Sequence, residues 1–463
     1  MTDAVVGTEA SALLQDWQSQ QREAFGHPRG LLYLTATEFW DRVSFHGMQA
    51  LLVLYMVEQL LLPGHVEHVA GFEAFRRAIE GVTGPLSTEA LAFQIFGIYV
   101  GLVYVTPLLG GLLGDRVLGR HRTVVLGALL MTAGHFSMAF DRSFLVALAL
   151  LTVGAGCLRG NLVSQVGTLY GTTDRRRADA FQIYAASINA GGFLAPIICG
   201  LLAKVYSWHV GFGFAGVGML VGLVVYLVGQ RHLPPEPLRS RSRTRIRLTA
   251  AERRLVATLM TMTPVTLCFY VAQSQVWNVY NIWVRDHVDL QVFGWTMPVP
   301  WLQSMDGLAP LAMMPVVVAW WRRQSSRGRE PDDLLKLVQG CLLFAAATAW
   351  LAAGNIVAGP GAKVPLVWAL LFHVLSNVGW LFVVPTALGL FAKSAPASVS
   401  ALMIGVYYLS IFGGSIVSGR LGVLYERIEP QAFWLLHAAI VGAGGLLLLL
   451  FARPLRRELS LAR

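Results

Sequence analysis

The sequence predicts an all-α membrane protein with twelve transmembrane helices. Of its 463 residues, 55% are hydrophobic and only 13% are charged, and the mean hydropathy is +0.57. Soluble domains carry about 25% charged residues, so this chain lacks the polar residues that a water-facing surface needs. Its apolar residues form long blocks, each close to the ~20 residues with which a helix crosses ~30 Å of hydrocarbon. Outer-membrane barrels are excluded because their signature is alternation over ~10 residues.

Twelve blocks of this kind follow one another along the chain. The expected spans are residues 31–60, 91–113, 123–140, 144–170, 178–203, 209–229, 254–280, 298–321, 334–357, 365–391, 399–420 and 432–452. A basic cytoplasmic linker at 230–253 divides them six and six. This division predicts an N-terminal six-helix bundle at 31–229 and a C-terminal bundle at 254–452, with short terminal segments at 1–30 and 453–463.

The net charge of +10 is explained by membrane topology. Of the 36 Lys and Arg residues, 26 fall in loops or at span ends on one side of the predicted membrane, 8 fall in loops or at a span end on the other side, and Arg42 and Arg159 lie deep inside spans. Such asymmetry places both termini in the cytoplasm, and we expect an inner (plasma) membrane protein. Cationic residues on that side meet anionic lipid, so no nucleic-acid partner is expected.

The cysteines give no sign of a metal site or a disulfide framework. All four lie within apolar spans, and no CxxC spacing occurs: Cys157, Cys199, Cys268 and Cys341. Isolated cysteines in apolar helices behave as small core residues. We therefore expect neither a metal nor a cofactor.

Four charged residues of the N-terminal half lie well inside predicted spans. Glu38, Asp41 and Arg42 share one face of the first span, because their spacing is i, i+3 and i+4. Central charges cost ~2.5–3.5 kcal/mol each, so they mark a water-lined cavity or an ion path unless they only pair with one another. Arg159, in the fourth span, can hold an anion but cannot relay a proton, because its guanidinium stays charged. We expect these side chains to face a shared aqueous chamber.

The turn after the second span has the sequence GGLLGDRVLGRHR. It resembles the motif between helices 2 and 3 of the major facilitator superfamily, whose two six-helix halves enclose a site near the membrane midplane. The resemblance implies a cytoplasmic gate formed by Gly111, Gly114, Asp115, Arg116, Gly119 and Arg120.

Further motifs resemble the proton-dependent oligopeptide transporter (POT) family of that superfamily. The run from Gly110 to Gly134 fits its first signature, and Phe181–Phe193 fits its second with one departure at Ala185. The likeness extends over essentially the whole chain, through His27-Pro28-Arg29-Gly30, Glu38-x-x-Asp41-Arg42, Gly47-Met48, Trp208-x-x-Gly211-Phe212, Phe293-Gly294, Ser394-Ala395-Pro396 and Met403-x-Gly405.

The resemblance implies proton-driven symport of di- and tripeptides by alternating access. It assigns proton coupling to Glu38, Asp41 and Arg42. His46 departs from the family and is either a second proton site or a hydrogen-bond donor. The substrate carboxylate is expected to bind Arg42 and Arg159. The remaining pocket is expected to include Tyr99, Asn161, Asn189, Trp277, Asn278, Trp380, Tyr407 and Tyr408, although any single aromatic among them has packing in the core as an alternative.

Several positions depart from the family pattern. Asp41 stands where the family has glutamate, and Arg159 stands where it has lysine. Gln49 and Ser274 replace the two charged partners of an outer-side ion pair, so that gate is expected to close by other means. His46 replaces a tyrosine and titrates near neutrality when unperturbed.

The tenth span departs most. Trp380 occupies the position of the family's glutamate, which meets the peptide amino group. An unpaired ammonium in a low-dielectric cavity costs several kcal/mol. Asp306, in the eighth span, stands where the family has asparagine, which suggests that the amine-binding carboxylate has moved to it. His373 and Asn377 precede Trp380 by two turns and one turn.

The sequence bears on two other functions. A transporter of a non-peptide solute (an anion, a modified amino acid or a drug) fits the same fold, because the usual peptide-binding charges are altered. An integral membrane enzyme is disfavoured, because the sequence has no HExxH, no GxSxG and no Cys/His cluster. The expected partners are a small peptide, protons and the lipid bilayer, and the chain is expected to function as a monomer.

Overall fold

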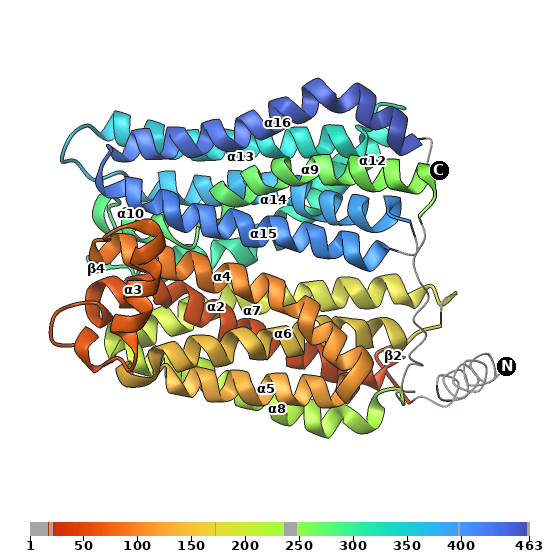
Figure 1. The fold of residues 1–463 in the computed structure, drawn as a ribbon, viewed down its shortest axis with the longest axis horizontal. Helices are drawn as coiled ribbons and strands as arrows, with labels where there is room; N and C mark the ends of the chain where they lie inside the picture. The colour runs from red at the N-terminus through yellow and green to blue at the C-terminus, as the bar shows by residue number, and fades with distance from the viewer. Residues whose placement is uncertain (1–16, 18–21, 172, 236–247, 397–398, 461–463) are drawn as a thin grey trace. The chain divides into compact units, whose positions relative to one another are not determined.

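The computed structural model describes residues 17, 22–171, 173–235, 248–396 and 399–460 (Figure 1). Most of the predicted terminal segment 1–30 and half of the linker 230–253 lie outside these described residues. Within them, almost all regular structure is helical.

A long helix covers each of the twelve predicted spans, which confirms the all-α membrane fold. The helices are α2 (Arg29–Tyr55), α4 (Thr88–Leu113), α5 (Arg120–Ser137), α6 (Phe144–Thr168), α7 (Arg176–Val205), α8 (Trp208–Gly229), α9 (Ala250–Gln275), α12 (Met305–Ser325), α13 (Asp333–Ala358), α14 (Leu366–Ser394), α15 (Ser400–Gly422) and α16 (Pro430–Ser460). Among the described residues, ten segments are long and apolar enough to span a bilayer by those criteria alone. The helices α2 and α5 fall outside that set, and α2 carries the buried charges.

Short elements connect or extend these helices. They are η1 (Met56–Leu60), η2 (Val66–His68), α3 (Phe72–Thr83), η3 (Gly114–Leu118), η4 (Asp141–Ser143), η5 (Gln230–His232), α10 (Val279–His287), α11 (Pro300–Gln303) and η6 (Val423–Glu426). The helix α3 is an amphipathic element in a stretch expected to be a loop, and it buries Phe72 and Ile79. With 12 residues it is too short to cross the apolar layer, which takes about 20.

Two short hairpins have the same turn sequence, Phe-Gly. Strands β1 (Glu23–Ala24) and β2 (His27–Pro28) are antiparallel, as are β3 (Gln291–Val292) and β4 (Trp295–Thr296). Both turn residues have positive φ in each hairpin, 54° and 78° at Phe25 and Gly26 and 50° and 79° at Phe293 and Gly294. This conformation is that of a two-residue hairpin turn of the primed type.

The contacts within the chain define two compact units. Unit 1 comprises residues 1–51, 67–71 and 106–244, and unit 2 comprises residues 52–66, 72–105 and 245–463. In unit 1, α5 packs against both α6 and α8. In unit 2, α13 packs against α14 and α16, and Figure 1 shows α13 and α16 running side by side. The division into two six-helix bundles at 31–229 and 254–452 stays a prediction.

Arg176, at the start of α7, anchors the β1–β2 hairpin in unit 1. Its guanidinium lies 2.6 Å from the Glu23 carboxylate and donates to the carbonyl oxygen of Gly26. It also bonds Asp174 at 2.9 Å. Hydrogen bonds from the Arg176 side chain and backbone lower the pKa of Asp174, so this contact stabilises the fold above the ordinary pKa of aspartate and is lost as the pH falls through the lowered value.

The helices α4 and α6 approach each other most closely at a pair of glycines. A Cβ atom added to Gly110 would lie 1.9 Å from the carbonyl oxygen of Gly156, whereas one added to the neighbouring Gly111 would meet nothing within 4 Å. Small residues allow this backbone contact, as is common where helices pack in membranes.

This contrast predicts opposite outcomes for two neighbouring substitutions. Gly110→Ala should destabilise the protein by about 1–3 kcal/mol, because the added methyl group overpacks against backbone that cannot move aside. Gly111→Ala should be neutral or slightly stabilising, since alanine favours a helix. Thermal unfolding of the two purified variants measures the difference, and equal melting temperatures would contradict the close packing.

Candidate functional site

The three charged residues of α2 form one buried cluster in unit 1. The carboxylates of Glu38 and Asp41 are 1% and 0% exposed, whereas the Arg42 side chain is 14% exposed. Arg42 Nε donates to Glu38 Oε1 at 2.6 Å, and its Nη2 lies 3.3 Å from Asp41 Oδ2. The helical spacing therefore places both acids around one guanidinium, and the cation is the most accessible member.

Arg159, on α6, reaches the same cluster. Its Nε lies 3.4 Å from Asp41 Oδ2, so one carboxylate oxygen lies between two guanidinium groups. The Arg159 guanidinium also lies 3.9 Å from the centroid of the Phe45 ring, a cation–π contact. His46 packs edge-on against Phe45 at a centroid distance of 5.3 Å. The cluster thus contains two buried acids and two partly exposed arginines, a charge-balanced set.

Tyr184, on α7, completes the cluster, and the sequence analysis did not assign it a role. Its hydroxyl donates to Glu38 Oε2 at 2.5 Å, and its side chain is buried. Glu38 therefore binds Arg42 through one oxygen and Tyr184 through the other. The only signal in the sequence was that Tyr184 lies within the second family signature.

Tyr184→Phe should remove one of the two side chains that hold the Glu38 carboxylate. The hydrogen bond stabilises the charged carboxylate, and a hydrogen bond to a charged group contributes about 1.5–3 kcal/mol, where about 1.4 kcal/mol corresponds to one pH unit. We expect the half-maximal pH of proton-driven uptake to rise by about one unit. An unchanged pH profile at normal expression would contradict the role of this hydroxyl.

In unit 2, Asp306 is held by two side chains of α14. Its Oδ1 accepts from His373 Nδ1 and from Asn377 Nδ2, both at 2.8 Å. The Asp306 side chain is 16% exposed and the His373 side chain is fully buried. Both contacts reach Oδ1, so Oδ2 is the oxygen left for a ligand. Asp306 lies in the first turn of α12, directly after the break at Ser304.

The other residues expected in the pocket occupy several separate places. Tyr407 is buried, its hydroxyl lies 2.6 Å from that of Tyr270, and its ring packs edge-on against Tyr408. Trp277 and Asn278 are buried at the junction of α9 and α10, Tyr99 is buried on α4, Asn189 is half-buried on α7, and Trp380 packs beside Leu381 and Phe382. Asn278 donates to the carbonyl oxygen of Phe93 at 3.2 Å.

Asn161 uses its amide within unit 1 to join two helices. Its Nδ2 donates to the carbonyl oxygens of Gly110 and Cys157 at 3.0 and 2.9 Å. Its Oδ1 lies 2.2 Å from where a Cβ of Gly114 would stand. The structure therefore places Asn161 in the contact between α4 and α6, next to the expected gate motif.

The gate motif forms a charged turn between α4 and α5. Asp115 Oδ1 lies 3.1 Å from Arg120 Nη2, and Arg116 is exposed. Gly119 has a φ of 80° and immediately precedes α5, so a glycine is required there.

Comparison with known proteins identifies the family of this chain. A family model described as the POT family matches residues 121–247 and 240–435, more than half of the chain. The chain belongs to the POT family. It is accordingly an integral membrane protein with the fold of POT transporters.

Individual POT relatives are similar over almost their full length. A di-/tripeptide transporter from Lactococcus lactis subsp. cremoris is 25% identical, over 96% of this chain and 98% of the relative. A transporter from Bacillus subtilis without an assigned substrate is 29% identical, over 93% and 95%. A crystal structure of a POT peptide transporter in complex with sulfate is 26% identical, with a TM-score of 0.84 over 96% of this chain and 99% of that chain.

Unit 2 of this POT protein contains an ion cluster around Arg285, at the end of α10. Its guanidinium lies 3.0 Å from Glu89 of α4 and 3.7 Å from Glu58 of η1, and it also pairs with Asp286. Ser274 and Gln49 occupy the two positions where the family's outer-side charges are missing. The Ser274 hydroxyl lies 3.0 Å from that of Ser415 of α15, and Gln49 is buried. The Arg285 cluster escaped the sequence analysis because its members lie in three distant segments.

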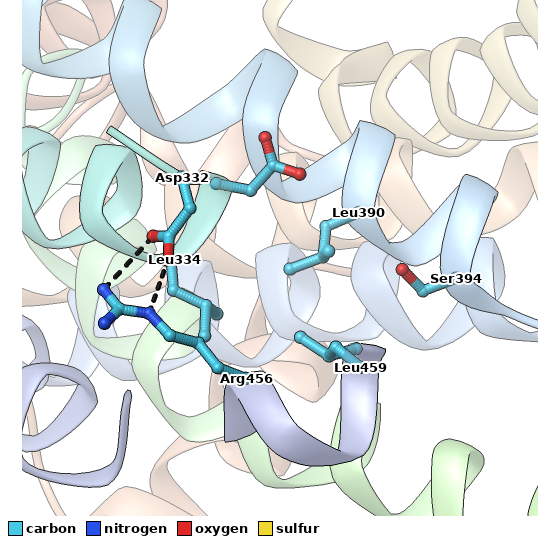
Figure 2. A pocket seen from close by; sticks show the side chains of 7 residues that line it. Asp332, Leu334, Leu390, Ser394, Arg456 and Leu459 are labelled. Atoms are coloured by element: carbon cyan, nitrogen blue, oxygen red, sulfur yellow. Dashed lines mark hydrogen bonds and ion pairs between the residues drawn. The ribbon is translucent and has the colours of Figure 1, made fainter. Parts of the chain in front are cut away.

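A cavity of about 290 Å³ lies elsewhere in unit 2, at the ends of α13, α14 and α16. Figure 2 shows Arg456 directed at Asp332, with a shortest N–O distance of 2.5 Å, beside Leu334, Leu390, Ser394 and Leu459. It contains none of the residues expected to bind substrate. Asp306 lies at the opposite end of the helices from this cavity, since it starts α12 whereas the cavity lies where α14 and α16 end.

Proposed function

We propose that this POT protein is a proton-coupled symporter that takes up di- and tripeptides by alternating access. The observation that carries the proposal is the buried cluster of Glu38, Asp41, Arg42 and Arg159, in which two titratable acids hold two partly exposed cations. Relatives that are named di-/tripeptide transporters and match over their full length support the substrate class.

The two arginines are suited to the carboxylate of a peptide. A guanidinium binds a carboxylate through paired, charge-assisted hydrogen bonds. Arg42 and Arg159 are more exposed than the acids they contact, so a ligand reaches the cations first. Asp306 then supplies the negative charge for the peptide amine through its Oδ2.

Proton coupling follows from competition for these arginines. When Glu38 or Asp41 is protonated, it no longer holds its arginine by charge, and the guanidinium turns to the substrate carboxylate. Deprotonation on the cytoplasmic side restores the internal ion pair and releases the substrate. A singly protonated cluster carries a net charge of +1, which the substrate carboxylate cancels. Proton and peptide together therefore restore a balanced cluster that costs less to enclose in a dry state, and their binding shifts the balance between conformations. His46 lies beside this cluster as an additional hydrogen-bonding or proton-binding group.

The outer side is proposed to close through the Arg285 cluster instead of the ion pair that Gln49 and Ser274 cannot form. Arg285 joins the ends of α4 and η1 to α10, all within unit 2. The close contact of Gly97 with the carbonyl oxygen of Ser415, 2.5 Å from where a Cβ would stand, joins α4 to α15 as well. Opening this side then requires these contacts to separate.

We infer the membrane and the orientation of the protein in it from the charge pattern. The protein lies in the inner (plasma) membrane with both termini in the cytoplasm. Its membership of a transporter family supports transport in place of a chemical reaction, and we propose that it works as a monomer. Aromatic and amide side chains complete the pocket, with Tyr99, Asn189, Trp277, Asn278, Trp380, Tyr407 and Tyr408 as its candidates and Asn161 as a support of the neighbouring helices.

A non-peptide solute is the second candidate, because Trp380 replaces the acid expected in the tenth span. A POT structure 23% identical to this chain was solved with 5-aminolevulinic acid. Competition for binding by dialanine, trialanine, free alanine, 5-aminolevulinic acid and nitrate separates the candidates. Peptide transport predicts that the two peptides compete most strongly, and stronger competition by any of the other three would replace it.

A further inference from the structure

The proposed function leaves one buried titratable group of unit 2 without a role. His373 is fully buried on α14, where its ring packs edge-on against Tyr280 at 5.1 Å and beside Phe372 at 5.5 Å. Its Nδ1 bonds Asp306, but its buried Nε2 has no hydrogen-bond partner. An imidazole used only for packing or structure normally has both nitrogens satisfied when it is buried.

The contacts determine which nitrogen carries the proton in the resting pair. If Nε2 carried it, a buried N–H would have no acceptor, which is costly. If Nδ1 carries it, this N–H donates to Asp306 Oδ1, which also accepts from Asn377. The resting pair is therefore a neutral imidazole beside a charged carboxylate, with a net charge of −1.

This pair can accept one further proton. Protonation at Nε2 gives an imidazolium beside the carboxylate, and the net charge becomes zero; the charge-assisted bond to Asp306 then offsets the cost of the unpaired Nε2–H. Among the described residues, Asp306 and Tyr280 are the titratable groups in contact with the ring, and the buried Tyr280 hydroxyl is directed at the carbonyl oxygen of Ala369. No Lys or Arg side chain forms an ion pair with Asp306 within the described part of the chain.

We propose that Asp306 and His373 form one proton-binding unit, in which a proton and the substrate ammonium group compete for the same carboxylate. The inference rests on the proposed role of Asp306 in binding the amine. When an ammonium group docks at Asp306 Oδ2, a neighbouring imidazolium is repelled, the Nε2–H bond breaks, and the proton passes to water. One proton leaves for each ammonium bound, so the affinity for peptide falls as the pH falls and the pair becomes protonated.

Calorimetry of dialanine binding in buffers of different ionisation enthalpy, at pH values from about 5 to 8, tests this exchange. His373→Asn keeps a donor near the position of Nδ1 but cannot be protonated. We expect this variant to bind dialanine as tightly as wild type at the alkaline end. At the acid end it should release up to one proton fewer per peptide and lose less affinity than wild type.

His437→Asn is the matched control, because His437 is an equally buried histidine of unit 2 that contacts Gln275 and a backbone carbonyl but no carboxylate. It should keep the wild-type proton release. Identical release by wild type and His373→Asn would overturn the proposal. So would an equal loss of affinity at every pH in both His373→Asn and His373→Gln, since a purely structural role predicts that result.

A substrate-free measurement keeps this inference separate from the proposed function. If dialanine does not bind wild type at all, the peptide proposal fails, but the proton-binding unit is still decided by titration of the empty protein. Wild type should then take up one more proton than His373→Asn between pH ~8 and ~5, and equal uptake would refute the pair.

Discussion

Replacing Asp306 with asparagine should weaken dialanine binding at least ~30-fold. Asparagine keeps an oxygen that accepts from His373 and Asn377, so the local hydrogen bonds survive, but the negative charge is lost. Removing one partner of a desolvated charge pair costs about 2–5 kcal/mol, and 2 kcal/mol corresponds to ~30-fold in affinity. Equilibrium binding to the purified protein measures this change.

Two controls isolate the charge at Asp306. Asp333→Asn makes the same chemical change in unit 2, at an aspartate that pairs with Lys393 beside the separate cavity, and it should bind dialanine as wild type does. N-propionyl-alanine, which is dialanine without its amino group, should bind wild type and Asp306→Asn equally. Wild-type affinity of Asp306→Asn for dialanine would show that the amine binds elsewhere.

Replacing Glu38 with glutamine should abolish the accumulation of peptide that a pH gradient drives, while exchange of peptide for peptide continues. Glutamine resembles the protonated acid: its carbonyl oxygen accepts from Arg42 and its amide group donates to the Tyr184 hydroxyl. The conformational cycle of the loaded protein then needs no proton. Net concentrative uptake does need a proton. Glutamine at this position can neither bind a proton outside nor release it inside, so the pH gradient no longer drives the return of the empty protein.

Paired assays in proteoliposomes distinguish these two activities. Counterflow of labelled dialanine against internal dialanine should proceed at a rate similar to wild type, and accumulation under an imposed gradient should fall to the equilibrium level. Glu80→Gln is the control, because Glu80 lies on α3 and pairs with the half-exposed Arg76, and it should behave as wild type does. Concentrative uptake by Glu38→Gln would remove Glu38 from the coupling mechanism.

The long helices could be predicted because the bilayer imposes one simple rule on them. Each span needs about 20 apolar residues, and each of the twelve predicted spans overlaps one observed long helix, with ends that differ by up to eight residues. The amphipathic α3 escaped prediction because a 12-residue helix with low mean hydropathy looks like a polar loop. The Phe-Gly hairpin turns escaped because they depend on positive φ at a phenylalanine, which sequence preferences disfavour.

The charges of the site were predictable, but most of their partners were not. Glu38, Asp41, Arg42 and Arg159 stand out because buried charge in a membrane is costly and therefore rare. Tyr184 binds Glu38 across 146 residues of sequence, and only the packing of α7 against α2 brings them together. Asn161 appeared to be a pocket residue, yet its amide is occupied by backbone carbonyl groups of α4 and α6, because the glycines of α4 let the helices approach.

Uptake of labelled dialanine by wild-type proteoliposomes, with and without an acidic exterior, tests proton-coupled peptide symport most directly. Symport predicts accumulation above the external concentration only when the exterior is more acidic, and collapse of that accumulation when a protonophore is added. The same final level of dialanine with and without the gradient would contradict coupling to protons.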